Sequence, residues 1–114
     1  MNHGNTEQPP PVYGYLRVFS DADHEAAPRL ERDMERFARH QGLRLMRVQR
    51  ELAYGRLDGF TALVDTLRRT GAQDVCVPSL GHLGQSDTLQ RVLMDRLETS
   101  LGVTVHLLDE LRRG

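Results

Sequence analysis

The sequence predicts an α/β domain with a mainly parallel sheet of four or five strands and helices on both faces. Short runs of β-branched and aliphatic residues alternate with longer segments whose apolar residues recur at helical spacing. Glycines stand where those helical segments should end. Because strands alternate with helices, right-handed crossovers should place the strands parallel in one sheet.

Length and composition indicate one soluble domain. The 114 residues are enough for a modest core, and 39% hydrophobic with 27% charged residues is typical of soluble globular proteins. No apolar run is long enough to cross a membrane, and the first residues lack the regions of a secretory signal, so we expect a cytoplasmic protein without membrane contact. The single cysteine cannot form an internal disulfide, which agrees with a reducing compartment.

The charge pattern argues against a dedicated DNA-binding domain. Arginine supplies all 15 basic residues, yet the formal net charge is -1 and the sequence pI is near 6.5. A duplex-binding domain usually carries a clear positive excess, because contacts with phosphates supply most of its affinity. We therefore expect DNA binding to be weak or absent.

The first half of the chain contains two strand–helix units. Residues 1–11 are polar and rich in proline, so they predict a disordered N-terminal arm ahead of a domain over residues 12–114. Residues 12–19 (VYGYLRVF) predict a first strand. The following helix should have Pro28 near its first turn and Gly42 just past its end.

The second unit begins with a strand over residues 43–52, in which Leu43, Leu45 and Val48 are expected to face inward. A polar loop follows, and Asp58 is expected to act as the N-cap of a helix that ends at Gly71. The inner stripe of this helix should consist of Phe60, Leu63, Val64 and Leu67.

The second half repeats the alternation. Residues 74–78 (DVCVP) predict a short buried strand, with Cys76 as a small core residue rather than a reactive thiol. After a loop over residues 79–85, Ser86 should cap a third helix that Gly102 ends. Residues 103–108 (VTVHLL) predict the last strand. The inner face of the third helix is expected to hold Leu89, Val92, Leu93 and Leu97.

In open parallel sheets, ligands bind beyond the carboxyl ends of the strands. The candidate loops therefore follow Phe19, Leu52, Pro78 and Leu108. Histidines 24, 40 and 106 are scattered without paired cysteine or carboxylate spacing, so we expect neither a metal site nor a cofactor.

Five collinear segments carry a family resemblance. Residues 15–18 (YLRV) resemble the Tyr-x-Arg-Val opening of serine recombinase (resolvase and invertase) catalytic domains, and residues 30–32 (LER) resemble the start of the first helix in that family. Residues 59–67 (GFTALVDTL), 77–86 (VPSLGHLGQS) and 103–109 then match later segments in spacing and order. Together they cover roughly residues 12–110 and imply a resolvase catalytic-domain-like fold.

The resemblance implies a reaction whose nucleophile this chain lacks. In the family a serine hydroxyl attacks a DNA phosphodiester without a metal, and arginines stabilise the charge on the phosphate. The nucleophile follows the motif arginine by two positions, and Phe19 stands there. Ser20 is one residue later, and a one-residue shift along a strand would point its hydroxyl to the opposite face.

The arginines of the family are also depleted. Over the family's Leu-Asp-Arg-Leu-Gly-Arg signature, the acid becomes Gly81 and the two arginines become His82 and Gln85. Leu57 stands at another arginine position, with Arg56 adjacent, so Arg17 alone keeps its place. We expect no catalytic residues, only a vestigial pocket of Arg17, Phe19, Ser20, Arg56, His82 and Gln85. The chain also ends at Gly114, before the positions of the family's long pairing helix and helix-turn-helix domain, so both main DNA contacts are expected to be missing.

Several residues have two readings. Arg17, Ser20, Ser79 and Ser86 are candidates for anion binding, whereas an ion pair of Arg17 with Asp21 or Glu51 is the favoured alternative. An exposed loop histidine is the favoured reading of His82. Loop acids near the first helix, Asp21 and Asp23, are expected to be caps rather than catalytic or ion-binding groups.

The leading functional hypothesis is a non-catalytic recombinase-like domain that acts through protein–protein contact, as a regulatory or accessory factor or as a homodimer. A residual phosphodiester-cleaving enzyme that uses Ser20 with Arg17 and Arg56 is the second hypothesis. A small-anion or nucleotide-binding module is the third.

Overall fold

The computed structural model describes residues 8–113. None of the helices in that range has both the length and the apolar character that a membrane span requires. The elements follow in the order β1 (Pro11–Arg17), α1 (Asp21–His40), β2 (Arg44–Glu51), α2 (Asp58–Thr70), β3 (Asp74–Val77), the 3-10 turn η2 (Leu80–His82), α3 (Asp87–Asp95), the π-helical turn η3 (Arg96–Ser100), β4 (Thr104–Leu107) and α4 (Leu108–Arg113).

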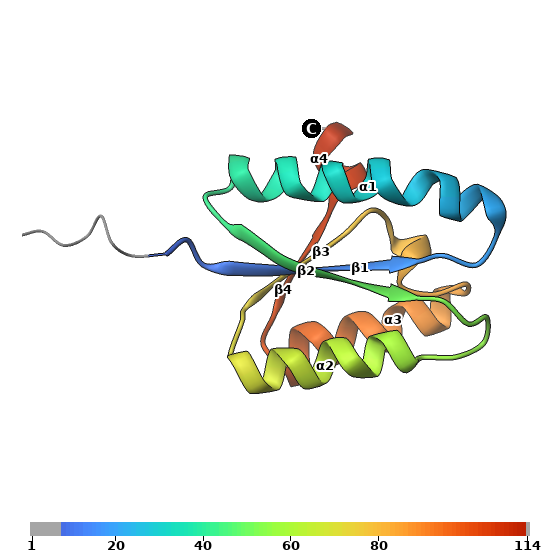
Figure 1. The fold of residues 1–114 in the computed structure, drawn as a ribbon. Coiled ribbons are helices and arrows are strands. Elements are labelled where there is room, and N and C mark those ends of the chain that lie inside the picture. Colours follow the sequence, from blue (N-terminus) through green and yellow to red (C-terminus); the bar gives the residue numbers. More distant parts are fainter. Residues whose placement is uncertain (1–7, 114) are drawn as a thin grey trace, which may run out of the picture.

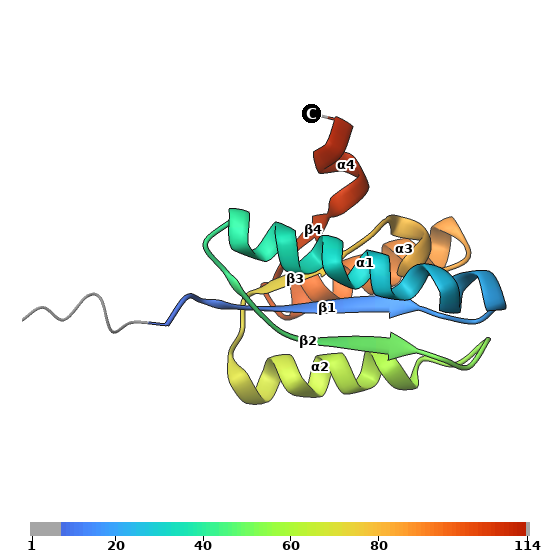
Figure 2. The same ribbon diagram turned by 45° about the horizontal axis from the view of Figure 1, so that its top comes forward.

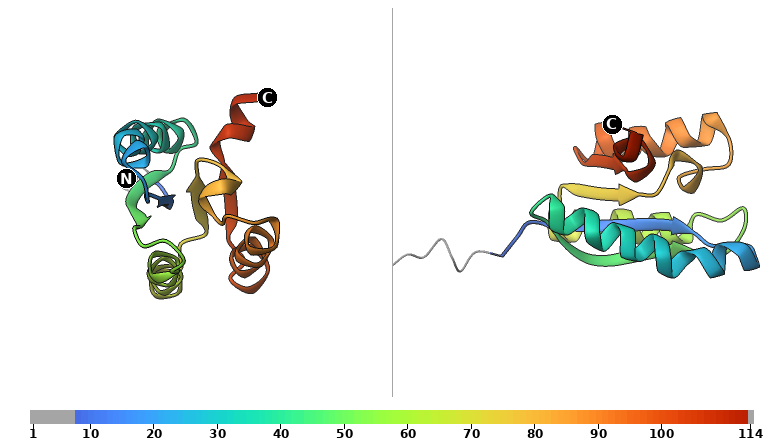
Figure 3. Two further views of the ribbon diagram at one scale, coloured as in Figure 1. Left: turned by 90° about the vertical axis from the view of Figure 1, so that its right-hand side faces the viewer. Right: turned by 90° about the horizontal axis from the view of Figure 1, so that it is seen from above.

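The four strands form one parallel sheet in the order β2-β1-β3-β4, which can be followed from bottom to top in Figure 2. Helices α1 and α4 lie on one face, and α2 and α3 lie on the other (Figure 1). The end-on view shows the same two layers, with β2 between α1 and α2 at one side of the sheet (Figure 3, left). The predicted α/β class, the parallel sheet and the helices on both faces are confirmed.

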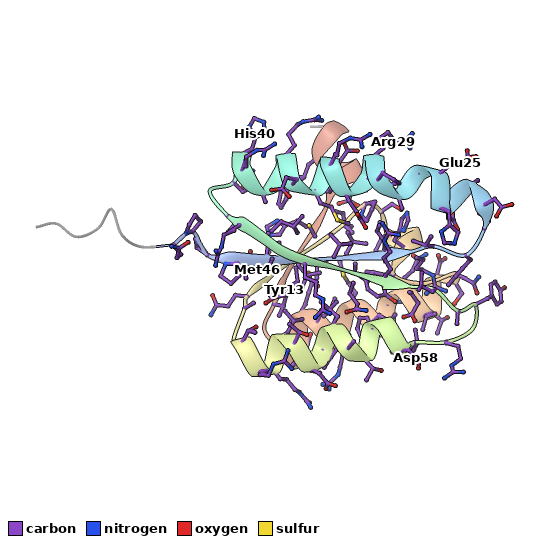
Figure 4. All side chains as sticks on the ribbon, viewed as in Figure 1. Tyr13, Glu25, Arg29, His40, Met46 and Asp58 are labelled. Atoms are coloured by element: carbon purple, nitrogen blue, oxygen red, sulfur yellow. The ribbon has the colours of Figure 1, made fainter. Side chains whose placement is uncertain are left out.

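Two apolar clusters fill the space on either side of the sheet. The cluster under α1 includes Val12, Leu16, Met34 and Cys76. The cluster over α2 and α3 is larger and contains Tyr15, Phe60, Leu63, Val75, Leu93 and Leu97 among others. Figure 4 shows the outer side of α1 in polar side chains, with Glu25, Arg29 and His40 labelled there. Cys76 is fully buried, as predicted, and burial raises the pKa of its thiol to about 12.

A register shift in β2 explains its inward residues. Val12 pairs with Leu45 and the next residue, Tyr13, pairs with Arg47, so Met46 is the extra residue of a bulge. A residue inserted here lets Leu45 and Val48 pack on the same cluster although they are three positions apart. Both were predicted to face inward, and both do.

Helix α1 begins earlier than the sequence indicated. Ser20 is its N-cap and Asp21 its first residue, so Pro28 lies inside the helix rather than near its first turn. That prediction was wrong because the capping pattern at Ser20 and Asp23 starts the helix a full turn or more before the proline. Pro28 is exposed and has no N–H to donate to the carbonyl four residues earlier.

Two further boundaries and one core residue differ from expectation. The first strand ends at Arg17 rather than Phe19, and it begins at Pro11, one residue before the predicted domain boundary. Most of the predicted disordered arm lies outside the described residues, so that part stays a prediction. Val92 is 57% exposed instead of buried, because the helical period that buries Leu93 and Leu97 turns it to the outer side of α3.

Candidate functional site

The candidate site lies where the directions of the chain connections diverge. From β1 the chain passes to α1 on one face, whereas from β3 it passes to α3 on the other (Figure 1). The carboxyl ends of β1 and β3 are adjacent, so their loops diverge at a topological switch point, the usual ligand position in such sheets. A cavity of about 260 Å³ opens there, lined by Arg17, Phe19, Asp23, Ser79, Gly81, His82 and Gln85.

Arg17 at the end of β1 is the buried cation of this cavity, with 6% of its surface exposed. Its Nη1 donates to the Leu83 carbonyl at 3.4 Å, and its Cζ lies 4.7 Å from the centre of the Phe19 ring. The expected ion pair with Asp21 or Glu51 does not form among the described residues. Glu51 accepts hydrogen bonds from Tyr15 and from the start of α2, and Asp21 lies at the exposed start of α1.

Phe19 occupies the position that the resemblance assigns to the nucleophile, and its ring packs against two neighbouring side chains. One neighbour of the ring is the guanidinium of Arg17, and another is the Tyr54 ring, 5.6 Å away between centroids at an interplanar angle of 58°. An aromatic ring so placed stabilises a buried guanidinium by cation–π attraction.

Ser20 does not line the cavity, because the start of α1 uses its hydroxyl. Its Oγ accepts from the Asp23 N–H at 3.1 Å, and Asp23 Oδ2 in return accepts from the N–H groups of Phe19 and Ser20 at 2.9 and 3.1 Å. These backbone hydrogen bonds hold the pKa of Asp23 below its usual value. The strand argument for Ser20 does not apply, since β1 has already ended, and the capping box sets the direction of the hydroxyl instead.

His82 was expected to be an exposed loop residue, and this expectation was wrong. It is half-buried, and its Nδ1 accepts from the Arg17 backbone N–H at 3.1 Å. In the neutral ring the proton therefore resides on Nε2. Burial is the main cause that lowers the pKa of His82, and Arg17 acts in the same direction, whereas Asp23 opposes it.

The remaining predicted residues divide between the cavity and the surface. Ser79 and Gln85 line the cavity together with Arg17, Phe19 and His82. Arg56 is exposed and forms an ion pair with Asp58 at 3.0 Å, outside the cavity. Ser86 caps α3 through the Leu89 N–H at 3.1 Å. The structure therefore brings five of the predicted residues together and leaves Ser20, Arg56 and Ser86 as helix caps or surface groups.

Glu51 is the residue that the sequence analysis missed as a helix cap. Its carboxylate is 1% exposed and accepts from the Tyr15 hydroxyl at 2.7 Å and from the N–H groups of Gly59 and Phe60 at 2.8 and 2.9 Å. It thereby replaces Asp58, which was predicted to be the N-cap of α2 but is the first residue of that helix. The sequence contained one signal for this cap: Glu51 is a single acid at the end of a strand, and Gly59 follows eight residues later at the start of a helix.

The comparisons with known proteins agree with this architecture. The C-terminal catalytic domain of ISC1926 TnpA, an IS607-like serine recombinase, superposes with a TM-score of 0.70 at 18% identity, over 90% of this chain and 76% of that one. The N-terminal catalytic domain of TP901-1 integrase gives a TM-score of 0.67 at 20% identity, over 88% of this chain and 78% of that one. The chain has the serine recombinase catalytic-domain fold. No family model and no curated protein matches the sequence.

On the serine recombinase fold, this cavity offers one guanidinium, one imidazole and one carboxylate to a ligand. Within residues 8–113, no group of three or more histidine, cysteine or acidic side chains is arranged to hold a metal ion. An entering phosphate would meet Arg17 but also the Asp23 carboxylate, whose low pKa keeps it negatively charged near neutral pH. The electrostatics of the cavity are therefore mixed.

Proposed function

We propose that this chain is a recombinase-type domain that does not cleave DNA and acts through contact with another protein. Its role would be that of a regulatory or accessory factor in DNA recombination. The observation that carries the proposal is the Phe19 ring, which stands at the nucleophile position and contacts both the guanidinium of Arg17 and the tilted ring of Tyr54.

The lack of a nucleophile supports the absence of cleavage. Phosphodiester transfer by this fold needs a hydroxyl in line with the leaving oxygen. The phenyl ring of Phe19 cannot attack phosphorus, and the hydroxyl of Ser20 is engaged in the capping box outside the cavity. Moving Ser20 into line would break the cap that starts α1.

The lack of positive charge supports it as well. Removing one contact to a transition-state oxyanion costs about 3 kcal/mol. Arg17 is the only arginine among the lining residues of the cavity, and it already donates to the Leu83 carbonyl. Several missing contacts of this size leave no effective route for DNA cleavage.

The surface around Tyr54 supports a role in protein contact. Leu52 is 61% exposed, Tyr54 71% and Leu57 36%, all in the loop between β2 and α2 beside the cavity. Exposed apolar groups that cluster on one loop are typical of protein interaction sites rather than of phosphate sites. Tyrosine in particular is favoured at such interfaces.

A DNA-cleavage assay on supercoiled plasmid tests the catalytic part. The wild type and Ser20→Ala should both leave the plasmid intact and form no covalent DNA adduct on denaturing gels. Nicking or an adduct in the wild type that is absent in Ser20→Ala would overturn the proposal in favour of a residual enzyme.

Association measurements test the contact part. Sedimentation of the chain alone, and with a catalytically active serine recombinase, should reveal a complex that Leu52→Ser with Tyr54→Ser weakens. The proposed role would be refuted if the chain associated neither with itself nor with the active recombinase. A thermal-shift screen with phosphate compounds completes the set, since stabilisation that Arg17→Met abolishes would instead favour an anion-binding module.

A further inference from the structure

Strand β2 leaves one of its edges open. It is eight residues long and pairs only with β1, at the end of the strand order β2-β1-β3-β4. In the end-on view α1 lies above and α2 below β2 (Figure 3, left), and near the carboxyl end of the strand Gly59 of α2 packs against the Arg50 carbonyl. An open edge presents unpaired backbone donors and acceptors, which are a template for another strand.

The backbone groups on this edge follow from alternation along the strand. The Glu51 carbonyl accepts from the Val18 N–H at 2.9 Å, so Glu51 directs its backbone groups toward the β1 side. Successive residues of a strand direct these groups to opposite edges, which places those of Val48 and Arg50 on the outer edge. The bulge at Met46 interrupts the ladder before this stretch.

The side chains along the edge carry one sign of charge. Arg44 and Arg47 are exposed, and neither forms an ion pair with a residue that the structure describes. Arg50 is held by Glu31 at 2.8 Å. The only acid of the strand is the buried Glu51, whereas Met46 and Leu52 expose 44% and 61% of their surfaces. The edge therefore combines unpaired cations with exposed apolar groups.

This charge selects among possible strands. A second copy of β2 would bring arginines against arginines, and like charges on paired strands are destabilising. An extended segment with acidic side chains would pair with the same arginines. Nucleic acid fits less well, because a phosphate chain only accepts hydrogen bonds at its backbone, whereas this edge offers both N–H and C=O groups. The other sheet edge, β4, is four residues long and has no arginine.

We propose that the outer edge of β2 binds an extended acidic segment of a partner protein by strand addition. The N–H and C=O of Val48 and the N–H of Arg50 supply the ladder, since Gly59 covers the Arg50 carbonyl, and Arg44 and Arg47 pair with acidic side chains of the added strand. This inference rests on the proposed role in protein contact and specifies the surface and the chemistry of the partner.

A fluorescent peptide of alternating glutamate and valine is the probe, with a lysine–valine peptide as its control. The full chain should bind the acidic peptide, more weakly as salt rises, and should not bind the basic one. Hydrogen exchange should show new protection at the amides of Val48 and Arg50. The double variant Arg44→Glu, Arg47→Glu should weaken binding by roughly tenfold or more, since two attractive pairs become repulsive.

The matched control is Arg68→Glu with Arg69→Glu, two exposed arginines in the last turn of α2, which should change binding by less than about twofold. Equal loss in both double variants, unprotected amides at Val48 and Arg50, or preference for a single-stranded oligonucleotide over the peptide would overturn the inference. The plasmid and sedimentation assays test the proposed function independently of the peptide assay. A negative peptide result would therefore refute strand addition at β2 without refuting the proposed function.

Discussion

Replacing Glu51 with glutamine should destabilise the domain more than its conservative chemistry suggests. All three hydrogen bonds of the carboxylate are accepted ones, two at Oε1 and one at Oε2. Glutamine has one oxygen, so its amide NH2 must face either the Gly59 N–H or the pair of donors from Tyr15 and Phe60. Two donors then meet in a site where Glu51 is 1% exposed.

The magnitude follows from two contributions. One buried donor left without an acceptor costs about 1–3 kcal/mol. Loss of a negative charge at the start of α2 adds about 0.3–1 kcal/mol, because the helix dipole favours an anion there. We expect the free energy of unfolding of Glu51→Gln to fall by about 1–4 kcal/mol, which lowers Tm by roughly 4 °C per kcal/mol.

Urea unfolding followed by circular dichroism measures this change, with the slope m as a check on two-state behaviour. Tyr15→Phe removes one of the donors but keeps the edge-to-face packing on Phe60, with ring centroids 5.8 Å apart, and should cost about 1–3 kcal/mol. Glu35→Gln on the exposed side of α1 is the matched control and should change stability by less than about 0.5 kcal/mol. If Glu51→Gln proved as stable as that control, the carboxylate would not be the cap that holds α2 to β2.

Three further outcomes are expected. Because burial lowers the pKa of His82 in the folded state, the unfolded chain binds its proton more readily, so the free energy of unfolding should fall as the pH drops below about 6.5. His82→Asn keeps an acceptor for the Arg17 N–H but does not titrate, so its free energy of unfolding, measured in urea, should fall less at low pH. Equal dependence of the two free energies on pH would contradict this. Gly59→Ala should lower Tm markedly because its Cβ would lie 2.8 Å from the Arg50 carbonyl oxygen, whereas Gly81→Ala, whose nearest contact is 3.6 Å away, should not. The Cys76 thiol should react with a thiol reagent at pH 8 only after unfolding, as it is fully buried and its pKa is raised to about 12, and rapid labelling of the folded protein would refute its burial.

The element order was accessible from the sequence because its signals are local. Apolar spacing marked each strand and helix, and Gly71 and Gly102 adopt the positive φ values that end helical segments. The errors also have local causes. Pro28 is compatible with a helix start, yet the capping box formed by Ser20 and Asp23 defines an earlier one. Val92 and Leu93 are adjacent apolar residues, and apolar spacing alone does not decide which of them faces the core.

The contacts of the site were less accessible because they join distant parts of the chain. The hydrogen bond from the Arg17 N–H to His82 spans 65 positions, and that from Tyr15 to Glu51 spans 36. The motif positions predicted that Arg17 and His82 share one pocket. They could not show that the imidazole of His82 accepts from the backbone N–H of Arg17 at the end of β1. A helix cap that comes from a preceding strand leaves no short-range pattern, so Glu51 remained hidden.

The polar groups of the cavity make hydrogen bonds within the fold, and their charges are mixed. Arg17 donates to the Leu83 carbonyl and stacks on Phe19, His82 accepts from the Arg17 backbone, and Asp23 accepts from two amides at the start of α1. An anion that reached the guanidinium of Arg17 would also approach the carboxylate of Asp23, and this repulsion opposes anion binding. Because these polar groups hold neighbouring loops together, we place partner contact at other surfaces and propose the apolar loop around Tyr54 and the edge of β2 for that role.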